Sequence, residues 1–143
     1  MHTSQDNRMA AVLAVSPFED DHRALRIILA AGDWKLISVR SMAEGIAWLA
    51  GHPVAVVVCS QHLPDGNWLL LLERAGAVVQ PPRLVVSSRL ADDQLWAEVL
   101  NLGGYDVLAT PFDSAEVRRV MLAARDSWHG GSRYRLRANG ASV

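Results

Sequence analysis

The sequence predicts an α/β protein in which a five-stranded parallel sheet is covered by helices on both faces. Short apolar stretches alternate five times with amphipathic stretches of helical period, and the connections between them are short. Residues 54–59 form an unbroken apolar run, which is typical of an interior strand that is buried on both faces. Because parallel neighbours need crossover connections, each intervening helix supplies one of them.

The first half of the chain predicts two strands, each followed by a helix. Apolar residues 9–15 form the first strand, and a helix with an acidic first turn follows from residue 19 to Gly32. Residues 34–39 alternate only in part, which favours a strand nearer the sheet edge. A Ser-x-x-Glu capping box then begins a helix that covers residues 41–51.

The second half repeats this pattern around the interior strand of residues 54–59. Strands are expected at residues 83–87 and 105–109, and helices at residues 67–75, 91–102 and 113–128. The last helix begins with an Asp-x-x-Glu capping box, and His129, Gly130 and Gly131 are expected to end it.

Size and composition indicate one domain. The chain has 143 residues, half of them hydrophobic, and its net charge of −1 gives no general attraction to nucleic acid or membranes. The polar start is not a signal peptide, no apolar run is long enough for a membrane span, and one cysteine permits no internal disulfide. We expect a cytoplasmic protein with a flexible leader at 1–8, a domain at 9–128 and a disordered Arg-rich tail at 129–143.

Three short motifs, in this order of elements, resemble the receiver domain of bacterial response regulators. They are Leu63-Pro64-Asp65-Gly66 after the third strand, Gly103 before the fifth, and Pro111-Phe112-Asp113 after the fifth. The resemblance covers residues 9–126. It implies a flavodoxin-like sheet with strand order 2-1-3-4-5, a role in two-component signalling, and a cis peptide bond between Thr110 and Pro111.

Typical receivers accept a phosphoryl group from phosphohistidine on an aspartate that ends the third strand. That aspartate and an acidic pair at the end of the first strand hold Mg²⁺. By resemblance, the acidic pair falls on Ser16 and Pro17 of this sequence, and the phosphoacceptor falls on Ser60. None of these three residues carries a carboxylate.

Two further receiver positions contact the phosphoryl group. The hydroxyl expected after the fourth strand is present as Ser87, but the lysine expected before Pro111 is replaced by Thr110. The only lysine of the chain, Lys35, lies in the second strand. The resemblance therefore implies a vestigial phosphorylation pocket that consists of Ser16, Pro17, Ser60, Ser87 and Thr110.

These replacements remove the groups on which receiver chemistry depends. A serine hydroxyl is a poor nucleophile without a neighbouring base, and Mg²⁺ gains little by exchanging water for neutral hydroxyls. We therefore expect a pseudo-receiver that is not an enzyme and that holds no metal and no cofactor. Glu19 and Asp20 lie within one turn of the pocket, so rescue of metal binding through water stays open as an alternative.

The face that receivers use for partners carries exposed apolar candidates. The aromatic switch position falls on Val107, and Tyr105, two residues earlier on the same strand face, is a substitute. Trp96 and Leu100 flank an inward stripe that we expect to consist of Leu95, Val99 and Leu102. Trp96, Leu100 and Tyr105 therefore form either a candidate interaction surface or part of a broader core stripe.

Other chemistry is weakly supported. Ser60, His62 and Asp65 suggest a hydrolase, but they lie in one loop and no Gly-x-Ser-x-Gly elbow surrounds the serine. Cys59 is a redox candidate that a buried strand residue explains better. The basic tail at 133–137 offers an acidic or phosphate contact, or is simply solvated. No metal-ligand spacing joins His22, His52, His62 and His129.

The sequence therefore predicts a pseudo-receiver in two-component or phosphorelay signalling that acts through protein partners. It is expected to act without phosphorylation of an aspartate and with no output domain after residue 126. One possible partner is a second copy of the chain, bound through the helix at 91–102, the strand at 105–109 and the helix at 113–128. Nucleic acid and membranes are not expected as partners. The alternative is a small-ligand sensor in which Ser16, Ser60, Ser87 and Thr110 line the binding pocket. A third option is phosphoryl acceptance on another side chain.

Overall fold

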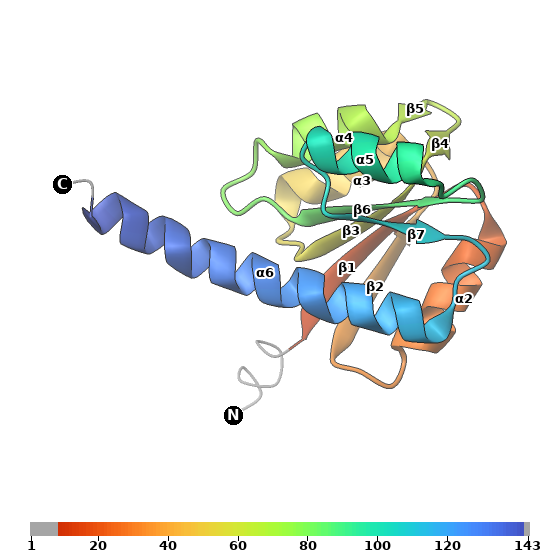
Figure 1. Cartoon of the computed structure of the whole chain (residues 1–143), viewed down its shortest axis with the longest axis horizontal. Helices are drawn as coiled ribbons and strands as arrows, with labels where there is room; N and C mark the ends of the chain where they lie inside the picture. The colour runs from red at the N-terminus through yellow and green to blue at the C-terminus, as the bar shows by residue number, and fades with distance from the viewer. Residues whose placement is uncertain (1–8, 142–143) are drawn as a thin grey trace.

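Five parallel strands form the central sheet of the structure, which is a computed structural model that describes the backbone of residues 9–141 and the side chains of residues 9–130. The strands are β1 (Ala10–Val15), β2 (Trp34–Val39), β3 (Val56–Ser60), β6 (Arg83–Ser88) and β7 (Asp106–Ala109). Their order, β2-β1-β3-β6-β7, confirms the order 2-1-3-4-5 predicted for the parallel strands (Figure 1).

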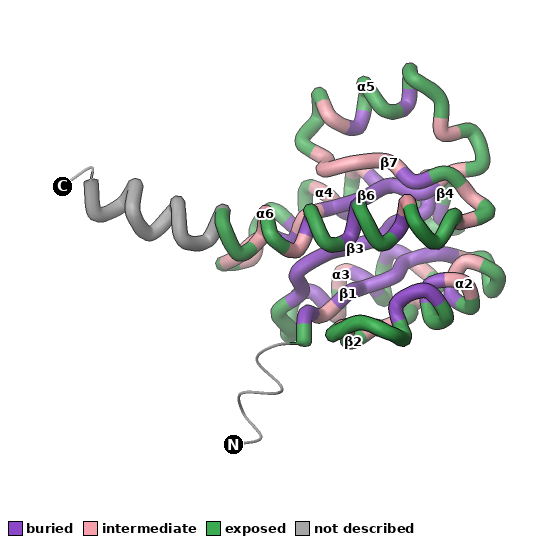
Figure 2. The backbone as a smooth tube through the Cα atoms, turned by 60° about the horizontal axis from the view of Figure 1, so that its bottom comes forward, coloured by how far each residue is buried: buried purple, intermediate pink, exposed green. Residues whose placement is uncertain are grey.

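Two layers of helices cover the sheet. One face carries α2 (Glu19–Leu29) and α6 (Ser114–Ala141), and the other carries α3 (Met42–Gly51), α4 (Trp68–Ala75) and α5 (Asp93–Asn101) (Figure 1). Each face has its own buried apolar cluster. The inner strands β1, β3 and β6 are buried along most of their length, whereas the edge strands β2 and β7 are mostly half-buried or exposed (Figure 2). The doubly wound α/β architecture is therefore confirmed. No helix within the described residues is long and apolar enough to cross a membrane.

Side-chain caps fix where four of the helices begin. For α6, the Asp113 carboxylate accepts a hydrogen bond from the Glu116 amide at 2.9 Å, as the Asp-x-x-Glu capping box predicted. The Ser41 hydroxyl accepts a hydrogen bond from the Glu44 amide at 3.2 Å, as the capping box predicted. The Asp92 carboxylate accepts from the Leu95 amide, and the Asn67 side chain accepts from the Leu69 amide. These caps bring α3, α4 and α5 to a defined start close to the carboxyl ends of the strands.

The segment that follows β3 contains a small hairpin that the sequence did not predict. Strands β4 (His62–Leu63) and β5 (Gly66–Asn67) pair antiparallel across the Pro64–Asp65 turn. Gly66 has a φ of +155° and a side chain there would collide with the Met42 thioether, so only glycine suits the turn.

Two expectations about helix ends were wrong. The last helix does not end at His129–Gly131, because α6 runs from Ser114 to Ala141. Glycine costs a helix only about 1 kcal/mol, and no proline interrupts the hydrogen-bond ladder there. Leu102, expected to point inward, is 48% exposed because α5 ends one residue earlier. The leader at 1–8 and the side chains of the tail lie outside the described residues.

Candidate functional site

Three buried serines follow or end neighbouring strands at the carboxyl edge of the sheet. Ser16 comes directly after β1, and Ser60 pairs with Ser87 in the register of β3 and β6. Their exposed fractions are 3%, 6% and 3%, respectively. The structure therefore places the three serines that the sequence assigned to a vestigial phosphorylation pocket at one edge of the sheet and buries them, whereas Thr110 of the same assignment is only partly buried.

The hydroxyl of Ser16 is already used inside the protein. It donates to the Asp21 carboxylate at 2.7 Å and accepts from the Phe18 amide at 3.0 Å. These two bonds hold the turn that leads from β1 into α2. Ser16 is therefore a structural hydrogen-bonding residue at the position that the resemblance assigned to a metal-binding carboxylate.

The hydroxyl of Ser60 is also used internally. It donates to the main-chain carbonyl of His62 at 3.2 Å, within the loop that leaves β3. The next residue, Gln61, donates its amide to the Ser87 carbonyl at 2.8 Å and accepts from the Ser88 hydroxyl at 2.6 Å. The loop is thus tied down on both sides of Ser60.

The loop after β7 reaches the same edge. The Thr110 amide donates to the Ser88 carbonyl at 3.0 Å, which extends the pairing of β6 with β7. The peptide bond between Thr110 and Pro111 is cis, as the sequence predicted. Thr110 therefore lies at the strand end where a receiver has its lysine, with a neutral side chain.

The carboxylates nearest this edge serve neighbouring cations or the chain itself. Glu19 forms an ion pair with Arg40, and this hydrogen bond lowers the pKa of the Glu19 carboxyl. Asp20 is exposed and lies 3.9 Å from Arg23. Neither is directed to the serines. Among the described residues, no group of three or more His, Cys, Asp or Glu side chains is arranged to hold a metal ion.

Asp21 is the carboxylate that the sequence analysis missed. It lies one residue after the two candidates considered, and among the carboxylates that the structure describes it alone makes a hydrogen bond to a pocket serine. The helix that starts at Glu19 has no side-chain cap, so its first turn can bend a carboxylate back toward Ser16. The missing N-cap residue at Phe18 was the available signal for this arrangement.

His22 is the buried titratable group beside these residues. It has no exposed surface, and its Nε2 lies 2.8 Å from the Ser16 carbonyl oxygen. Its Nδ1 is buried without a hydrogen-bond partner in the structure. The histidine therefore packs under the β1–α2 turn and does not join the other histidines in a metal site.

The hydrolase arrangement does not assemble. Ser60 bonds the main chain of His62, not its ring, and the His62 side chain is exposed. Asp65 points elsewhere: its two carboxylate oxygens accept from the amides of Met42 and Ala43 at 2.8 and 2.9 Å. These bonds lower the pKa of Asp65 and cap α3 from the neighbouring turn.

Cys59 is a buried core residue of β3. Burial raises the pKa of its thiol to about 12, so almost no thiolate is present at neutral pH. The residue packs in the cluster on the α3–α5 side of the sheet. This packing supports the structural explanation of Cys59 over redox sensing.

The switch positions of β7 are separated by the sheet. Val107 packs against the cluster on the α3–α5 side, whereas Tyr105 packs against the cluster on the α2–α6 side. The expectation that they share one strand face was wrong, because Tyr105 lies before β7 and directly after the Gly103–Gly104 turn. Tyr105 does not take the place of Val107.

An exposed tryptophan marks the surface of α5. Trp96 is 49% exposed, and Leu100, one turn further, is partly buried. A hollow of about 350 Å³ lies beside Trp96 between α5, β7 and α6. It is lined by Ala91, Asp92, Asp93, Trp96, Val107, Ala109 and Glu116.

Solved structures with the same architecture are receiver domains. The signal receiver domain of an HD domain-containing protein from Pseudomonas fluorescens Pf-5 has 24% sequence identity and a TM-score of 0.76, with 86% of this chain and 99% of that chain covered. A CheY-like response regulator receiver domain protein from Methanospirillum hungatei JF-1 has 16% identity and a TM-score of 0.76, covering 86% and 98%.

The chemotaxis response regulator CheY4 of Vibrio cholerae has 14% identity and a TM-score of 0.73, and the match covers 81% of this chain and 98% of that chain. No family model and no curated protein matches the sequence. At these identities the likeness establishes the receiver fold for almost the whole described chain and leaves the chemistry to the residues themselves.

Proposed function

We propose that this protein is a pseudo-receiver that acts in two-component or phosphorelay signalling through protein contacts, without phosphorylation of an aspartate. The observation that carries the proposal is Ser60 at the end of β3, buried and hydrogen-bonded to the His62 carbonyl. A receiver fold with a neutral, internally bonded side chain at that position has no carboxylate to accept a phosphoryl group there.

The electrostatics of the site support the same conclusion. Phosphoryl transfer depends on positioning and on neutralisation of several negative charges by a metal and a cation. Here Ser16 and Pro17 take the place of the acidic pair, and Thr110 takes the place of the lysine. Asp21, the carboxylate that contacts a pocket serine, is held by the Ser16 hydroxyl. One carboxylate gives Mg²⁺ too few charged ligands.

The surface around Trp96 is the proposed contact site for a protein partner. An exposed tryptophan beside a hollow is typical of the centre of an interface. The same hollow contains the carboxylates of Asp92, Asp93 and Glu116 and no cation. We therefore expect a partner that presents arginine or lysine. A symmetric homodimer would bring a second set of these carboxylates to the interface, where the like charges would repel one another.

The small-ligand alternative at the carboxyl edge has less support. Ser16 and Ser60 have already used their hydroxyl donors on Asp21 and on the His62 carbonyl. A ligand would have to displace both of these internal hydrogen bonds before the two hydroxyls could donate to it.

Phosphoryl transfer from acetyl phosphate in the presence of Mg²⁺, followed by intact mass, tests the proposal. We expect no phosphoryl adduct on the wild-type chain. The matched variant restores the receiver residues at four positions (Ser16→Asp, Pro17→Asp, Ser60→Asp and Thr110→Lys), and we expect it to gain a labile adduct. An adduct on the wild-type chain would refute the proposal.

Light scattering over a range of concentrations tests the contact surface. If the Trp96 face forms a homodimer, the mass of the wild-type chain rises with concentration and Trp96→Ala abolishes the rise. If the mass stays that of a monomer, the proposed partner is a different protein.

A further inference from the structure

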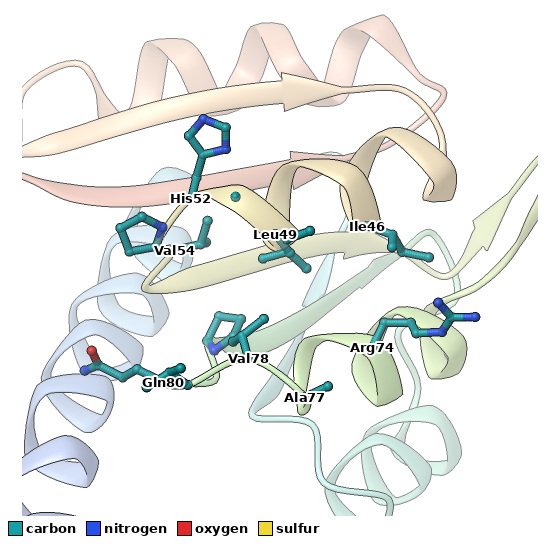
Figure 3. Close-up of a pocket in the computed structure, with 13 residues that line it drawn as sticks. Ile46, Leu49, His52, Val54, Arg74, Ala77, Val78 and Gln80 are labelled. Atoms are coloured by element: carbon teal, nitrogen blue, oxygen red, sulfur yellow. The ribbon is translucent and has the colours of Figure 1, made fainter.

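A second hollow opens at the opposite end of the sheet, near the amino ends of β3 and β6. Its volume is about 670 Å³, within the usual size range of small-molecule sites. Its walls come from the end of α3, the start of the segment that leads into β3, and the connection between α4 and β6 (Figure 3). None of the serines of the carboxyl edge lines it.

The short length of α4 explains why this hollow exists. The helix has eight residues and is about 12 Å long, whereas the six residues of the neighbouring strand β6 extend about 20 Å. After Ala75 the chain covers residues 76–82 without a regular helix. A loop therefore covers this sheet face at the amino ends of the strands, and the apolar side chains beneath it line a hollow.

The interior of the hollow is apolar. Leu49 and Val54 project into it from the α3 side, and Val78 projects toward them from the α4–β6 connection (Figure 3). Leu49 and Val54 are almost completely buried, so they form the packed inner wall of the hollow. His52 stiffens the rim, since its ring stacks on Trp48 with a centroid distance of 3.7 Å.

Arg74 gives the hollow a single positive charge. Its side chain lies at one end of the opening, across from Ile46 (Figure 3). No carboxylate lines the hollow, and Arg74 forms no ion pair with any side chain that the structure describes. An apolar cavity with one guanidinium at its mouth, and no carboxylate among its lining residues, is complementary to an amphipathic anion.

The carbonyl ends of α3 and α4 oppose this charge, because both helices end beside the hollow. Turn hydrogen bonds weaken the opposition. The Ala77 amide donates to the Arg74 carbonyl, and the Val78 amide donates to the Ala75 carbonyl. His52 Nδ1 lies 3.0 Å from the Trp48 carbonyl oxygen. We therefore expect the hollow to bind an anionic compound only modestly more tightly than a neutral compound of the same shape.

We propose that this hollow binds a small amphipathic carboxylate, with its hydrocarbon part on Leu49, Val54 and Val78 and its carboxylate at Arg74. The inference is independent of the function proposed above, because it uses other residues at the other end of the sheet. A ligand here would bridge α3 and the α4–β6 connection, and it would give the protein an input that needs neither metal nor phosphoryl transfer.

Amide NMR titration of the full chain with octanoate, and separately with octanol, tests this site. We expect saturable shifts for amides in residues 46–54 and 74–80 with both compounds. Octanoate is expected to bind about threefold more tightly, the size of effect that a solvent-exposed ion pair gives. Equal affinities, or shifts confined to other parts of the chain, would overturn the proposal.

Two variants separate the apolar and the charged contributions. Arg74→Gln should remove the preference for octanoate over octanol, whereas Arg118→Gln, an exposed arginine on α6, should retain it. Val78→Asp places a carboxylate in the hollow and should weaken octanoate binding at least about tenfold. Circular dichroism verifies that each variant is folded. Unchanged octanoate binding by folded Val78→Asp would also refute the site.

Discussion

The two ends of the sheet differ in how their side chains are satisfied. At the carboxyl end, Ser16 and Ser60 are buried and bonded to Asp21 and to the His62 carbonyl. At the amino end, Leu49 and Val54 face an open space of about 670 Å³. Ligand sites of open α/β sheets usually lie at the carboxyl end. In this protein the serine hydroxyls at that end are used in internal hydrogen bonds, and an apolar hollow lies at the other end.

The position of a ligand site in such a sheet therefore depends on which side chains still lack a partner, as well as on the order and direction of the strands. A receiver keeps its carboxyl edge reactive by crowding like charges that only a metal can neutralise. In this protein the hydroxyls of Ser16 and Ser60 at the same edge are used in short local hydrogen bonds. The amino edge stays open for a separate reason, because α4 is too short to cover the strands beneath it.

Thiol reactivity should show the largest contrast between the two ends. Burial raises the pKa of Cys59 from 9.0 to about 12, which reduces the thiolate at neutral pH about a thousandfold. We expect Cys59 to resist an aromatic disulfide reagent in the folded protein and to react after unfolding in urea. In the variant Cys59→Ala/Val78→Cys, the new thiol stands on a half-buried wall of the hollow and should react faster than Cys59.

Comparable rates for Cys59 and for the thiol at position 78 in the folded state would mean that the carboxyl end is as open as the amino end. The contrast between the two ends would then be wrong.

Leucine truncation should show the next largest effect. Leu13 and Leu49 belong to the same apolar cluster, but only Leu49 lines the hollow. Leu13→Ala leaves a closed cavity and should lower the free energy of unfolding by about 4 kcal/mol, whereas Leu49→Ala should lower it by about 2–3 kcal/mol because the site already opens to water. Urea unfolding measures both values, and a larger loss for Leu49→Ala would contradict an open amino end.

A carboxylate installed at Ser60 probes the neutrality of the carboxyl end. Ser60→Asp places a buried charge without a lysine or a metal, and it should lower the free energy of unfolding at pH 7 by about 2–3 kcal/mol. The isosteric control Ser60→Cys should cost about 1 kcal/mol, the value of one lost hydrogen bond. Adding Thr110→Lys should recover part of the loss. Wild-type stability of Ser60→Asp would show that the edge accommodates charge.

Asp65 should give the smallest effect, and its sign depends on pH. Hydrogen bonds from Met42 and Ala43 lower the pKa of Asp65 below its usual 3.8, so the folded state favours the carboxylate. The resulting stabilisation is complete above the unfolded pKa and is lost as the pH falls through the lowered folded pKa. Asp65→Asn should therefore reduce the Tm at pH 7 and have less effect in acid.

A Tm difference between wild type and Asp65→Asn that stays constant from neutral to acidic pH would show that this carboxylate does not cap α3. In that case it would be free for other chemistry at the carboxyl edge.

The sequence was sufficient for most of the fold because local signals agreed with one another. The apolar run at 54–59 predicted the interior strand, and the Ser-x-x-Glu box gave the start of α3. The resemblance supplied the strand order and the cis bond before Pro111, and both were confirmed. These features depend on neighbours in the sequence or on a pattern of motifs, which a single sequence displays.

What the sequence did not reveal depends on contacts between distant segments or on the exact end of an element. Tyr105 was predicted to share a face of the sheet with Val107, but it lies on the other face, because β7 begins one residue later at Asp106. Leu102 was taken as buried because helical period continued past the end of α5. The hollow at the amino end has no motif at all, since it results from the length of one helix relative to a strand.

The most direct test of the central claim, that the carboxyl edge has lost its receiver chemistry, is amide NMR of the wild-type chain titrated with Mg²⁺ and beryllium fluoride, a mimic of the phosphoryl group. The account predicts no saturable shift at Ser16, Ser60, Ser87 or Thr110, while the four-position restored variant responds at all of them. Saturable wild-type shifts at Ser16 and Ser60 would contradict it.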